Sequence, residues 1–414
     1  MNEKKTPGFH YGYLIVIACC VLMLGPCCFS FNTAGIFYDS VSKELGVGKG
    51  DFGLYMTIEY LTMFLVLPLA GKMLNKYDAR LILTTAVIMV AGSLMAMSTF
   101  HSVYSFYVAG FLIGVANAWI LYLVVPVLIG RWFKKNVGLW VGLCMAFTGV
   151  GGIIFNPIGG QLITDYGWRT GYLTFGIIAA VIALPFTLFV IRSYPSDKGL
   201  QPYGEGEVDE SAPVKLTGVS VRTAVKSPAL YLMAFYAGLV NLGLTVNYYL
   251  PSYVGTLGMP LTVGATLAST VMFGSLFGKI GLGWLNDKSV PMAMVTGLSS
   301  GIIGLGALML FASHGLWVIL AAGVFFGIFF ASATTTTPMM ARFIFGDRDY
   351  SQIYSYVTMA CAFLAAFGSA IWGFIFDATG SYLPTLGIDI CIMALCFVLG
   401  IGAMKIGKNL PREA

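Results

Sequence analysis

Long apolar stretches alternate with short polar interruptions along almost the whole chain. A stretch of about 18 residues or more with few charges can cross a hydrocarbon core about 30 Å thick as an α-helix. The bilayer offers no water to the backbone, so runs this long predict helices rather than the strands of a barrel. The pattern predicts twelve membrane-spanning helices, at residues 11–39, 51–74, 80–100, 104–131, 137–164, 168–192, 227–254, 261–285, 290–312, 315–342, 350–376 and 381–404.

The composition indicates an integral membrane protein rather than a soluble enzyme. Hydrophobic residues make up 58% of the 414 residues and charged residues only 10%, whereas a soluble domain has about 25% charged residues. The first apolar stretch is longer than a signal-peptide core and lacks its cleavage pattern, so we expect it to remain as a helix. All eight cysteines fall in predicted helices without metal-site or disulfide spacing, so we expect them to be packing residues. The sequence has no phosphate-binding loop, nucleotide motif or metal cluster, so we expect no metal and no cofactor.

Basic residues gather on one side of the predicted membrane. With the N-terminus in the cytoplasm, 19 of the 23 Lys and Arg residues fall in cytoplasmic segments, three fall outside, and Lys279 lies within a helix. This asymmetry follows the positive-inside rule and predicts that both termini are cytoplasmic. The net charge of +5 therefore reflects topology, and nucleic acid is not an expected partner. The expected location is the cell membrane, that is, the inner or plasma membrane.

One polar segment, residues 193–226, divides the chain into two halves. It is rich in Pro, Gly, Glu and Lys, which is typical of a cytoplasmic linker between residues 1–192 and 227–414. The halves repeat each other at an offset near 212 residues. The matching pairs are Gly71 and Gly283, Pro126 and Pro338, Asp165 and Asp377, and (one residue off) Arg131 and Arg342. We expect an all-α membrane protein of two pseudo-symmetric six-helix bundles, a plan of transporters that bind substrate near the midplane.

A lysine interrupts the eighth predicted helix, in the stretch FGSLFGKIGLGWLNDKS at residues 273–289. Lys279 precedes Asp287, at the cytoplasmic boundary, by eight residues, so it lies about 12 Å deep and near the midplane. A charge at this depth costs about 2.5–3.5 kcal/mol, so it needs a wet cavity, a partner or a substrate. Two interpretations remain open. The ammonium reaches back to the inner headgroups, or it binds an anion in a central cavity.

Two carboxyl groups are also expected inside the membrane. Glu59 lies eight residues after Asp51, so about 12 Å from the outer surface, and Tyr55 and Thr62 share its polar stripe. Burial favours the neutral form of a carboxyl group, which suits a proton carrier, and a structural hydrogen bond is the alternative. Asp389 lies at a similar depth in the twelfth helix, where we favour a structural role.

Polar residues form one stripe on the seventh predicted helix. Asn241, Thr245, Tyr248 and Ser252 are spaced by three or four residues, so they fall on one face. Such a stripe is typical of a polar cavity wall, and hydrogen bonding between neighbouring helices is the alternative.

Several motifs resemble those of the major facilitator superfamily. GWLNDK at 283–288 is similar to the G-x-L-x-D-R loop after the eighth helix, and GKMLNK at 71–76 is its first copy, with Asn75 in place of the usual Asp. The runs YGYLIVIA, RWFKKNVGLWVGL, NPIGGQLITDYGWRTGYL and YPSDKGLQPYGE resemble the bacterial oxalate/formate antiporter and monocarboxylate transporter group. The resemblance extends over essentially the whole chain and implies the major facilitator fold.

The resemblance also implies a set of residues around a central cavity. Lys279 stands where the family has an Arg, and Tyr122 matches a binding tyrosine in the fourth helix. Other substrate-binding positions are Asn32, Thr33, Phe330 and Thr334, joined by Asn241, Thr245 and Tyr248 because the seventh helix lines the cavity in this family. Positions for gating and topology at the cytoplasmic ends are Gly71, Arg131, Gly283, Asp287 and Arg342.

Two departures from the family change what the resemblance implies. The eleventh helix lacks the second cation of the oxalate transporter, which argues against a small dianion as substrate. Ser275 stands where the animal-type monocarboxylate transporters have an Asp four residues before the Arg, so the family's proton-coupling carboxylate is missing there.

We therefore expect a secondary active transporter, and no enzyme, that moves a small organic anion, above all a monocarboxylate, by alternating access. Glu59 is the candidate for proton symport, and anion exchange (antiport) is the mechanistic alternative. The aromatic content of 14% and the NPIGG run, similar to a motif of drug/proton antiporters, leave efflux of amphipathic compounds open. A transporter-like sensor is a third possibility. The expected partners are the anion, protons and the lipid bilayer, and the chain is expected to function as a monomer.

Overall fold

The computed structural model describes residues 10–204 and 218–412, apart from the side chains of Asn75, Tyr122 and Ser351. Within this part of the chain, twelve helical spans are long and apolar enough to cross a membrane, as the hydrophobic pattern predicts. The prediction of an all-α membrane protein is therefore confirmed.

The first six spans form the N-terminal bundle. Its first and fourth spans are interrupted by short π-helical or 3₁₀ segments, and its sixth span ends in one. The elements are α1 (Gly12–Leu22), η1 (Met23–Cys27), α2 (Cys28–Phe31), η2 (Ala34–Phe37), α3 (Tyr38–Leu45), α4 (Lys49–Lys76), α5 (Ala79–Met97), α6 (Val103–Asn117), η3 (Ala118–Val124), α7 (Val125–Trp132), α8 (Val137–Tyr166), α9 (Trp168–Pro185) and η4 (Phe186–Val190).

The last six spans form the C-terminal bundle. Its first span is broken by a 3₁₀ turn, and the others are continuous helices. The elements are α11 (Pro228–Leu244), η6 (Thr245–Tyr248), α12 (Leu250–Thr256), α13 (Leu261–Lys288), α14 (Val290–Phe311), η7 (Ala312–His314), α15 (Leu316–Phe345), α16 (Tyr350–Thr379) and α17 (Leu383–Gly407).

Local chemistry sets several helix ends. The side chain of Asp78 accepts a hydrogen bond from the backbone N–H of Arg80 and so caps α5. At the start of α11, Ser227 provides the same kind of cap, and Pro228 takes the first position, where its missing N–H has no consequence. Gly167 ends α8 with φ +83, a left-handed conformation that a side chain disfavours.

Prolines explain two of the breaks. Pro26 lies inside η1, where it lacks an N–H and its ring would clash with the carbonyl four residues earlier, so the helix widens. The Ser30 hydroxyl donates to the carbonyl of Pro26 at 3.1 Å, within the same break. Pro126, near the start of α7, follows the wide segment η3 for the same reason.

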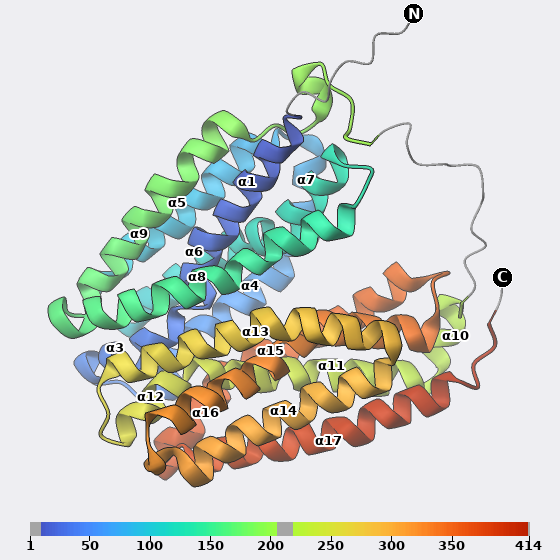
Figure 1. The fold of residues 1–414 in the computed structure, drawn as a ribbon. Coiled ribbons are helices and arrows are strands. Elements are labelled where there is room, and N and C mark those ends of the chain that lie inside the picture. Colours follow the sequence, from blue (N-terminus) through green and yellow to red (C-terminus); the bar gives the residue numbers. More distant parts are fainter. Residues whose placement is uncertain (1–9, 205–217, 413–414) are drawn as a thin grey trace, which may run out of the picture.

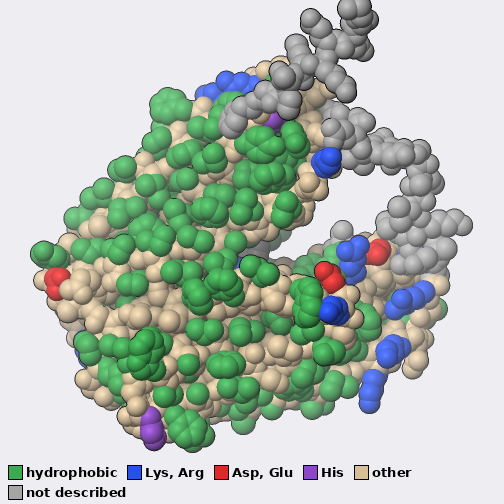
Figure 2. Space-filling view, in the orientation of Figure 1, with side chains coloured by type: hydrophobic (Ala, Val, Ile, Leu, Met, Phe, Trp, Pro, Cys, Tyr) green, Lys and Arg blue, Asp and Glu red, His purple; other side chains and the backbone are tan. Residues whose placement is uncertain are grey.

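The two bundles meet at one end and separate toward the other (Figure 1). The helix pairs that join them are α8 with α13 and α4 with α16. We call the end formed by α3, α12 and the α16–α17 turn the closed end, and the end near the two termini and α10 (Val221–Lys226) the open end. The space-filling view shows a wedge-shaped hollow between the bundles that widens toward the open end (Figure 2).

Helices α4 and α13 show how closely the two halves repeat. Both have 28 residues, and their first residues, Lys49 and Leu261, differ by 212 positions. This is the offset that the matching motif residues predict, and it confirms the two pseudo-symmetric six-helix bundles.

On the face shown in Figure 2, hydrophobic side chains spread over both bundles, as on a lipid-facing surface. Large exposed side chains from different helices include Leu65 at 72%, Phe189 at 72% and Trp317 at 82% exposure. Long charged stretches are absent from the described spans, so this surface fits the hydrocarbon core of a bilayer.

The segment expected as a linker contacts both bundles through its described parts. Tyr203 pairs with Phe133 of the N-terminal bundle, and Gly218 pairs with Gly346 of the C-terminal bundle. A short helix, η5 (Pro195–Lys198), lies before the first pairing and α10 lies after the second. Residues 205–217 of this segment lie outside the described part of the chain.

Candidate functional site

One stripe of side chains on α13 faces the N-terminal bundle. Its members recur every three or four residues and are Ala265, Ser269, Met272, Leu276 and Lys279. Toward the closed end the stripe packs on α8: Ser269 Oγ donates to the carbonyl of Ile153 at 2.5 Å, and Met272 covers Gly152. Lys279 continues the same stripe where the bundles separate, so its side chain faces the wedge.

Lys279 has no partner of its own. The side chain is half-buried, and its Nζ makes no hydrogen bond or ion pair with any described residue. The opposite face of this turn is held in place, because a Cβ on Gly278 would meet Ile328 at 2.9 Å and Ala331 at 3.0 Å on α15. The helix therefore presents an unpaired cation to the space between the bundles.

The seventh span contributes polar side chains, but they do not form the single continuous stripe that the sequence predicts. Tyr248 faces the opposite bundle, where its hydroxyl is 3.1 Å from that of Tyr60. Asn241 is half-buried, and its Nδ2 donates to the carbonyl of Ala237 in its own helix at 2.9 Å. Thr245 turns inward: it is 3% exposed and accepts from Trp372 Nε1 at 2.8 Å. The 3₁₀ turn η6 begins at Thr245 and ends the α-helical spacing on which the single stripe depended.

Asn32 and Thr33 lie in the break between α2 and η2. Asn32 is half-buried, and its Nδ2 donates to the carbonyl of Thr148 on α8 at 2.7 Å, which leaves its Oδ1 for other partners. Thr33 is fully buried, and its hydroxyl donates to the carbonyl of Phe29 in α2. Of this pair, only Asn32 presents a polar atom that a bound molecule could reach without a rearrangement.

Phe330 and Thr334 lie on the inner side of α15. They follow the lipid-facing Phe325 by five and nine residues, so they point roughly 140° and 180° away from it around the helix. Thr334 is nevertheless exposed, and its hydroxyl donates only to the carbonyl of Ala331. Its exposure is therefore to the wedge. The side chain of Tyr122, expected opposite, lies outside the described residues.

Glu59 lies inside the N-terminal bundle rather than in the wedge. Its Oε1 accepts from Asn117 Nδ2 at 3.0 Å, and the same nitrogen is 3.0 Å from Ser30 Oγ. The carboxyl group is fully buried, and its Oε2 has no partner among the described residues. The sequence indicated Glu59, but it did not indicate Asn117, a lone polar residue in an apolar run, or Ser30.

Asp389 is a second fully buried carboxyl group, in the C-terminal bundle. Neither oxygen has a partner among the described residues, and Oδ1 lies against Gly243 of α11. It faces the interior of its own bundle, away from the stripe that carries Lys279.

The motif residues lie toward the open end. Arg131 donates to the carbonyl of Leu74 and lies over the ring of Tyr194, and Arg342 pairs with Asp347. Asp287 is exposed, and Cβ atoms on Gly71 and Gly283 would meet nothing within 4 Å. Gly283 and Asp287 continue α13 beyond Lys279, whereas Gly71, Arg131 and Arg342 lie on the helices α4, α7 and α15.

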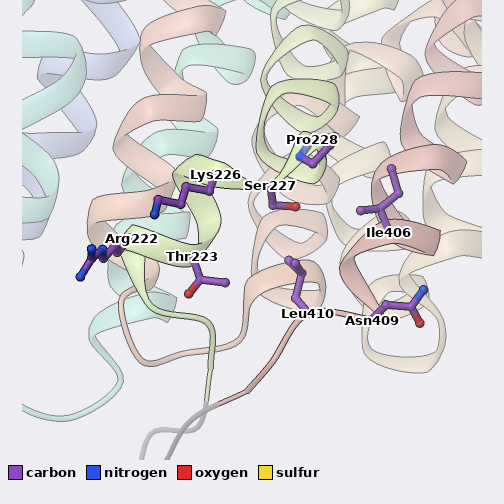
Figure 3. A pocket seen from close by; sticks show the side chains of 8 residues that line it. All are labelled: Arg222, Thr223, Lys226, Ser227, Pro228, Ile406, Asn409 and Leu410. Carbon is purple, nitrogen blue, oxygen red and sulfur yellow. The ribbon is translucent and has the colours of Figure 1, made fainter.

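A separate pocket of about 500 Å³ lies at the open end of the C-terminal bundle (Figure 3). It is lined on one side by α10 residues, among them Arg222 and Lys226, and on the other by Ile406, Asn409 and Leu410. It is built from one bundle alone, so it does not couple the two halves. We place the candidate site in the wedge.

Comparison with known proteins agrees with this arrangement. The family model "Major Facilitator Superfamily" matches residues 20–299. Monocarboxylate transporter 4 of Gallus gallus is 24% identical over 425 residues, which cover 99% of this chain and 86% of that protein. The membrane sensor protein UhpC of Escherichia coli (strain K12) is 25% identical, with 80% and 78% covered. A quinolone resistance transporter of Acinetobacter baumannii is 24% identical, with 67% of each covered.

Solved structures show the same fold. The nucleoside transporter NupG superposes with a TM-score of 0.72 at 11% identity, covering 97% of this chain and 100% of that one. A bacterial homolog of the human lysosomal transporter Spinster, in an inward-facing and unoccupied conformation, superposes with a TM-score of 0.66 at 14% identity, covering 97% of both. With its fold matched over almost its whole length and its sequence over most of it, the chain belongs to the Major Facilitator Superfamily.

Proposed function

We propose that this protein is a secondary active transporter of a small organic anion, and that the anion is a monocarboxylate. The observation that carries the proposal is Lys279, a half-buried cation near the membrane midplane that faces the wedge without a partner. An unpaired charge at this depth is unfavourable, and a bound carboxylate would supply the missing opposite charge.

The count of charges supports a single negative charge on the substrate. Helix α16 contains no Lys or Arg, so among the described helices Lys279 alone brings a cation to the wedge at this depth. A lysine is a point charge with rotatable donors, which selects for charge more than for the planar shape that an arginine would match. The similarity to proteins named monocarboxylate transporters supports the same substrate class.

In this proposal Asn32, Asn241, Tyr248, Phe330 and Thr334 shape the pocket around the anion. Tyr122 and Thr33 belong to it on the family resemblance, and Thr245 supports the wall from behind through Trp372. Residues 1–192 and 227–414 rock as two units around the site, with 193–226 as their linker. A single chain supplies both walls of the wedge, so the proposed functional unit is a monomer.

The distribution of positive charge supports a cytoplasmic position for the open end. Basic residues of the described loops and helix ends cluster there, among them Arg131, Lys134, Arg192, Lys226, Lys405 and Lys408. The conformation is then inward-open in the cell membrane, with cytoplasmic termini. Proton symport through Glu59 is the proposed coupling, and exchange of one anion for another is the alternative.

Thermal stabilisation tests the substrate class and the role of the lysine together. The purified protein is heated with a panel of monocarboxylates, dicarboxylates and lipophilic cations, because a ligand stabilises by mass action, by about 2.7 kcal/mol at 100 times its Kd. The variants are Lys279→Gln and, as a matched control on the same helix, Lys288→Gln, whose side chain is exposed and lies over Trp284. Monocarboxylates should raise Tm for the wild type and for Lys288→Gln but not for Lys279→Gln.

Other outcomes would favour a different binding site or a different function. Carboxylate stabilisation that survives in Lys279→Gln would remove the lysine from the site. Stabilisation by lipophilic cations alone would favour drug efflux, a candidate supported by the similarity to the quinolone resistance transporter and by the aromatic content of 14%. Binding without flux in vesicles would favour a sensor, the class to which UhpC belongs by name.

A further inference from the structure

A carboxylate of one bundle caps a helix of the other bundle at the closed end. Asp377, in the last turn of α16, accepts from the backbone N–H of Lys49 at 2.9 Å and from that of Gly50 at 2.7 Å. These N–H groups belong to the first turn of α4, where a helix has no partners of its own for them. The residue before α4, Gly48, has no side chain to act as a cap. A negative charge at this position also complements the helix dipole.

The side chain of Lys49 adds further interactions between the two bundles next to Asp377. Its Nζ donates to Asp39 of its own bundle at 2.9 Å and to the hydroxyl of Tyr382 in the other bundle at 2.7 Å. The ammonium also lies 4.6 Å from the centre of the Phe376 ring. A lysine of the N-terminal bundle is thus surrounded by polar and aromatic groups of the C-terminal bundle.

The backbones come close enough for these interactions because of glycines. A Cβ on Gly373 would lie 2.5 Å from the backbone nitrogen of Gly50, and a Cβ on Gly53 would lie 3.0 Å from the carbonyl oxygen of Ser369. The Tyr249 hydroxyl joins the carbonyls of Ser369 and Lys49, at 2.6 and 3.2 Å. The contact is continuous and would have to break as a whole.

The internal repeat supplies a second carboxylate at the equivalent place, and it makes no such contact. Asp165 ends α8 as Asp377 ends α16, and Leu261 begins α13 as Lys49 begins α4. Asp165 is exposed, and among the described residues its carboxylate accepts only from Gln161 in its own helix, at 2.8 Å. The two halves are pseudo-symmetric, but the carboxylate cap across the interface occurs on one side only.

We propose that Asp377, acting with Lys49, is the latch that holds the closed end together. Opening of this end separates α16 from the start of α4, which leaves two N–H groups and the carboxylate to be satisfied by water. A pocket of about 430 Å³, lined in part by Asp39, Lys49 and Asp377, borders the latch and gives water access to it. The inference rests on the alternating access proposed above and identifies a residue that sets the balance between its two states.

Distance measurement between spin labels tests the latch without any substrate. One label is attached at Tyr166→Cys on α8 and the other at Ser313→Cys in η7, both exposed and away from the latch. The partly exposed Cys361 and Cys391 are replaced by Ser in all samples. The latch variant is Asp377→Asn, which keeps the shape but loses the charge, and the matched control is its repeat equivalent Asp165→Asn.

Loss of the latch in Asp377→Asn should lengthen the distance between the two spin labels. The ratio of open to closed molecules at this end should rise by about tenfold, as expected for the loss of one hydrogen bond to a charged group. Asp165→Asn should give the distances of the parent protein. Unchanged distances in Asp377→Asn would overturn the latch, and equal opening in Asp165→Asn would overturn its one-sidedness.

A second variant keeps the test decisive if Asp377→Asn does not fold. Lys49→Gln removes the ammonium that bridges Asp39 and Tyr382, and it should lengthen the distance in the same direction. Parent-like distances in folded Lys49→Gln would then overturn the proposal. Carboxylate stabilisation is measured separately, so the latch can fail while the proposed substrate class stands, and the reverse also holds.

Discussion

The group that donates a hydrogen bond to Glu59, among the described residues, also contacts a neighbouring hydroxyl. Asn117 Nδ2 lies 3.0 Å from both Glu59 Oε1 and Ser30 Oγ, and Ser30 in turn donates to the carbonyl of Pro26. The carboxyl group therefore belongs to a small network that includes the break in the first span. A change of its charge would act on that break, since a buried network responds as a unit.

Glu59→Gln should separate proton coupling from folding. The glutamine amide oxygen can accept from Asn117 as the carboxylate does, so the protein should insert and fold normally. Uptake driven by a proton gradient should fall by about tenfold, within the usual range of coupling free energies. Vesicle uptake with and without the gradient measures this, and exchange of one anion for another serves as the control. Proton-driven uptake that stays unchanged would remove Glu59 from coupling.

Asn156 should be replaceable with a gain in stability. It is fully buried, neither amide atom has a partner among the described residues, and it lies one turn from the glycines that face Met272 and Ala265 of α13. An unsatisfied buried amide costs about 1–3 kcal/mol. Asn156→Leu should therefore raise Tm, as measured by thermal unfolding in detergent, and Asn156→Asp should lower it. A lower Tm for Asn156→Leu would contradict this account.

Single charged residues were predictable from the sequence, and their partners were not. The depth of Lys279 and Glu59 follows from helical rise and the distance to a loop charge. Which residue a side chain meets depends on how neighbouring helices are rotated and shifted, and nothing local encodes that. Asn117 is one polar residue in an apolar run, and only packing of α6 on α4 shows that it meets a carboxylate.

At the scale of single elements, the lengths of helices were predictable and their breaks were not. The predicted stretches 261–285 and 290–312 agree with α13 and α14 within three residues. Hydrophobic length defines a span because the bilayer does. The breaks η1 and η3 depend on where a proline ring clashes and on which groups satisfy the carbonyls around the break. The sequence shows Pro26, but not that the Ser30 hydroxyl turns back to its carbonyl.

Gly373→Ala should prevent the closed end from closing. The added methyl group would meet the backbone of Lys49 and Gly50 at 2.5–2.6 Å, and a backbone cannot move aside as a side chain can. Overpacking of this kind costs about 1–3 kcal/mol, so a reporter at Ser252→Cys, otherwise 2% exposed, should react with a thiol reagent about tenfold faster.

A matched glycine in the same bundle provides the control for this measurement. A Cβ on Gly306 of α14 would meet nothing within 4 Å, so Gly306→Ala should leave the rate at Ser252→Cys unchanged. Equal rates in Gly373→Ala and in the parent would show that the α4–α16 contact does not depend on the glycine.

At the scale of the whole molecule, the repeat and the two-bundle plan were predictable, while the way the bundles meet was not. The offset of 212 follows from motif residues in the sequence and holds for α4 and α13 residue by residue. Both halves carry an aspartate at the equivalent position. The repeat alone therefore does not specify whether Asp377 caps α4 or Asp165 caps α13. Asp377 and Asp165 differ only in what the opposite bundle presents to them.

The topology can be checked on intact cells. In the background without Cys361 and Cys391, a cysteine at Ser313 should react with a membrane-impermeant thiol reagent, because the closed end should face outward. A cysteine at Lys405 should react only after the membrane is permeabilised, because basic residues are retained in the cytoplasm. The reverse pattern would place the open end outside and invert the assignment.

The one-sided cap has a kinetic consequence. If breaking the Asp377 contact is the uphill step, an empty carrier rests with its site toward the cytoplasm, and its return to the outside limits the turnover of uptake. A substrate that binds from the inside and lowers the barrier to breaking the Asp377 contact would make each return to the outside faster. Radiolabelled uptake should then be quicker into vesicles preloaded with unlabelled anion than into empty ones, and Asp377→Asn should narrow that difference.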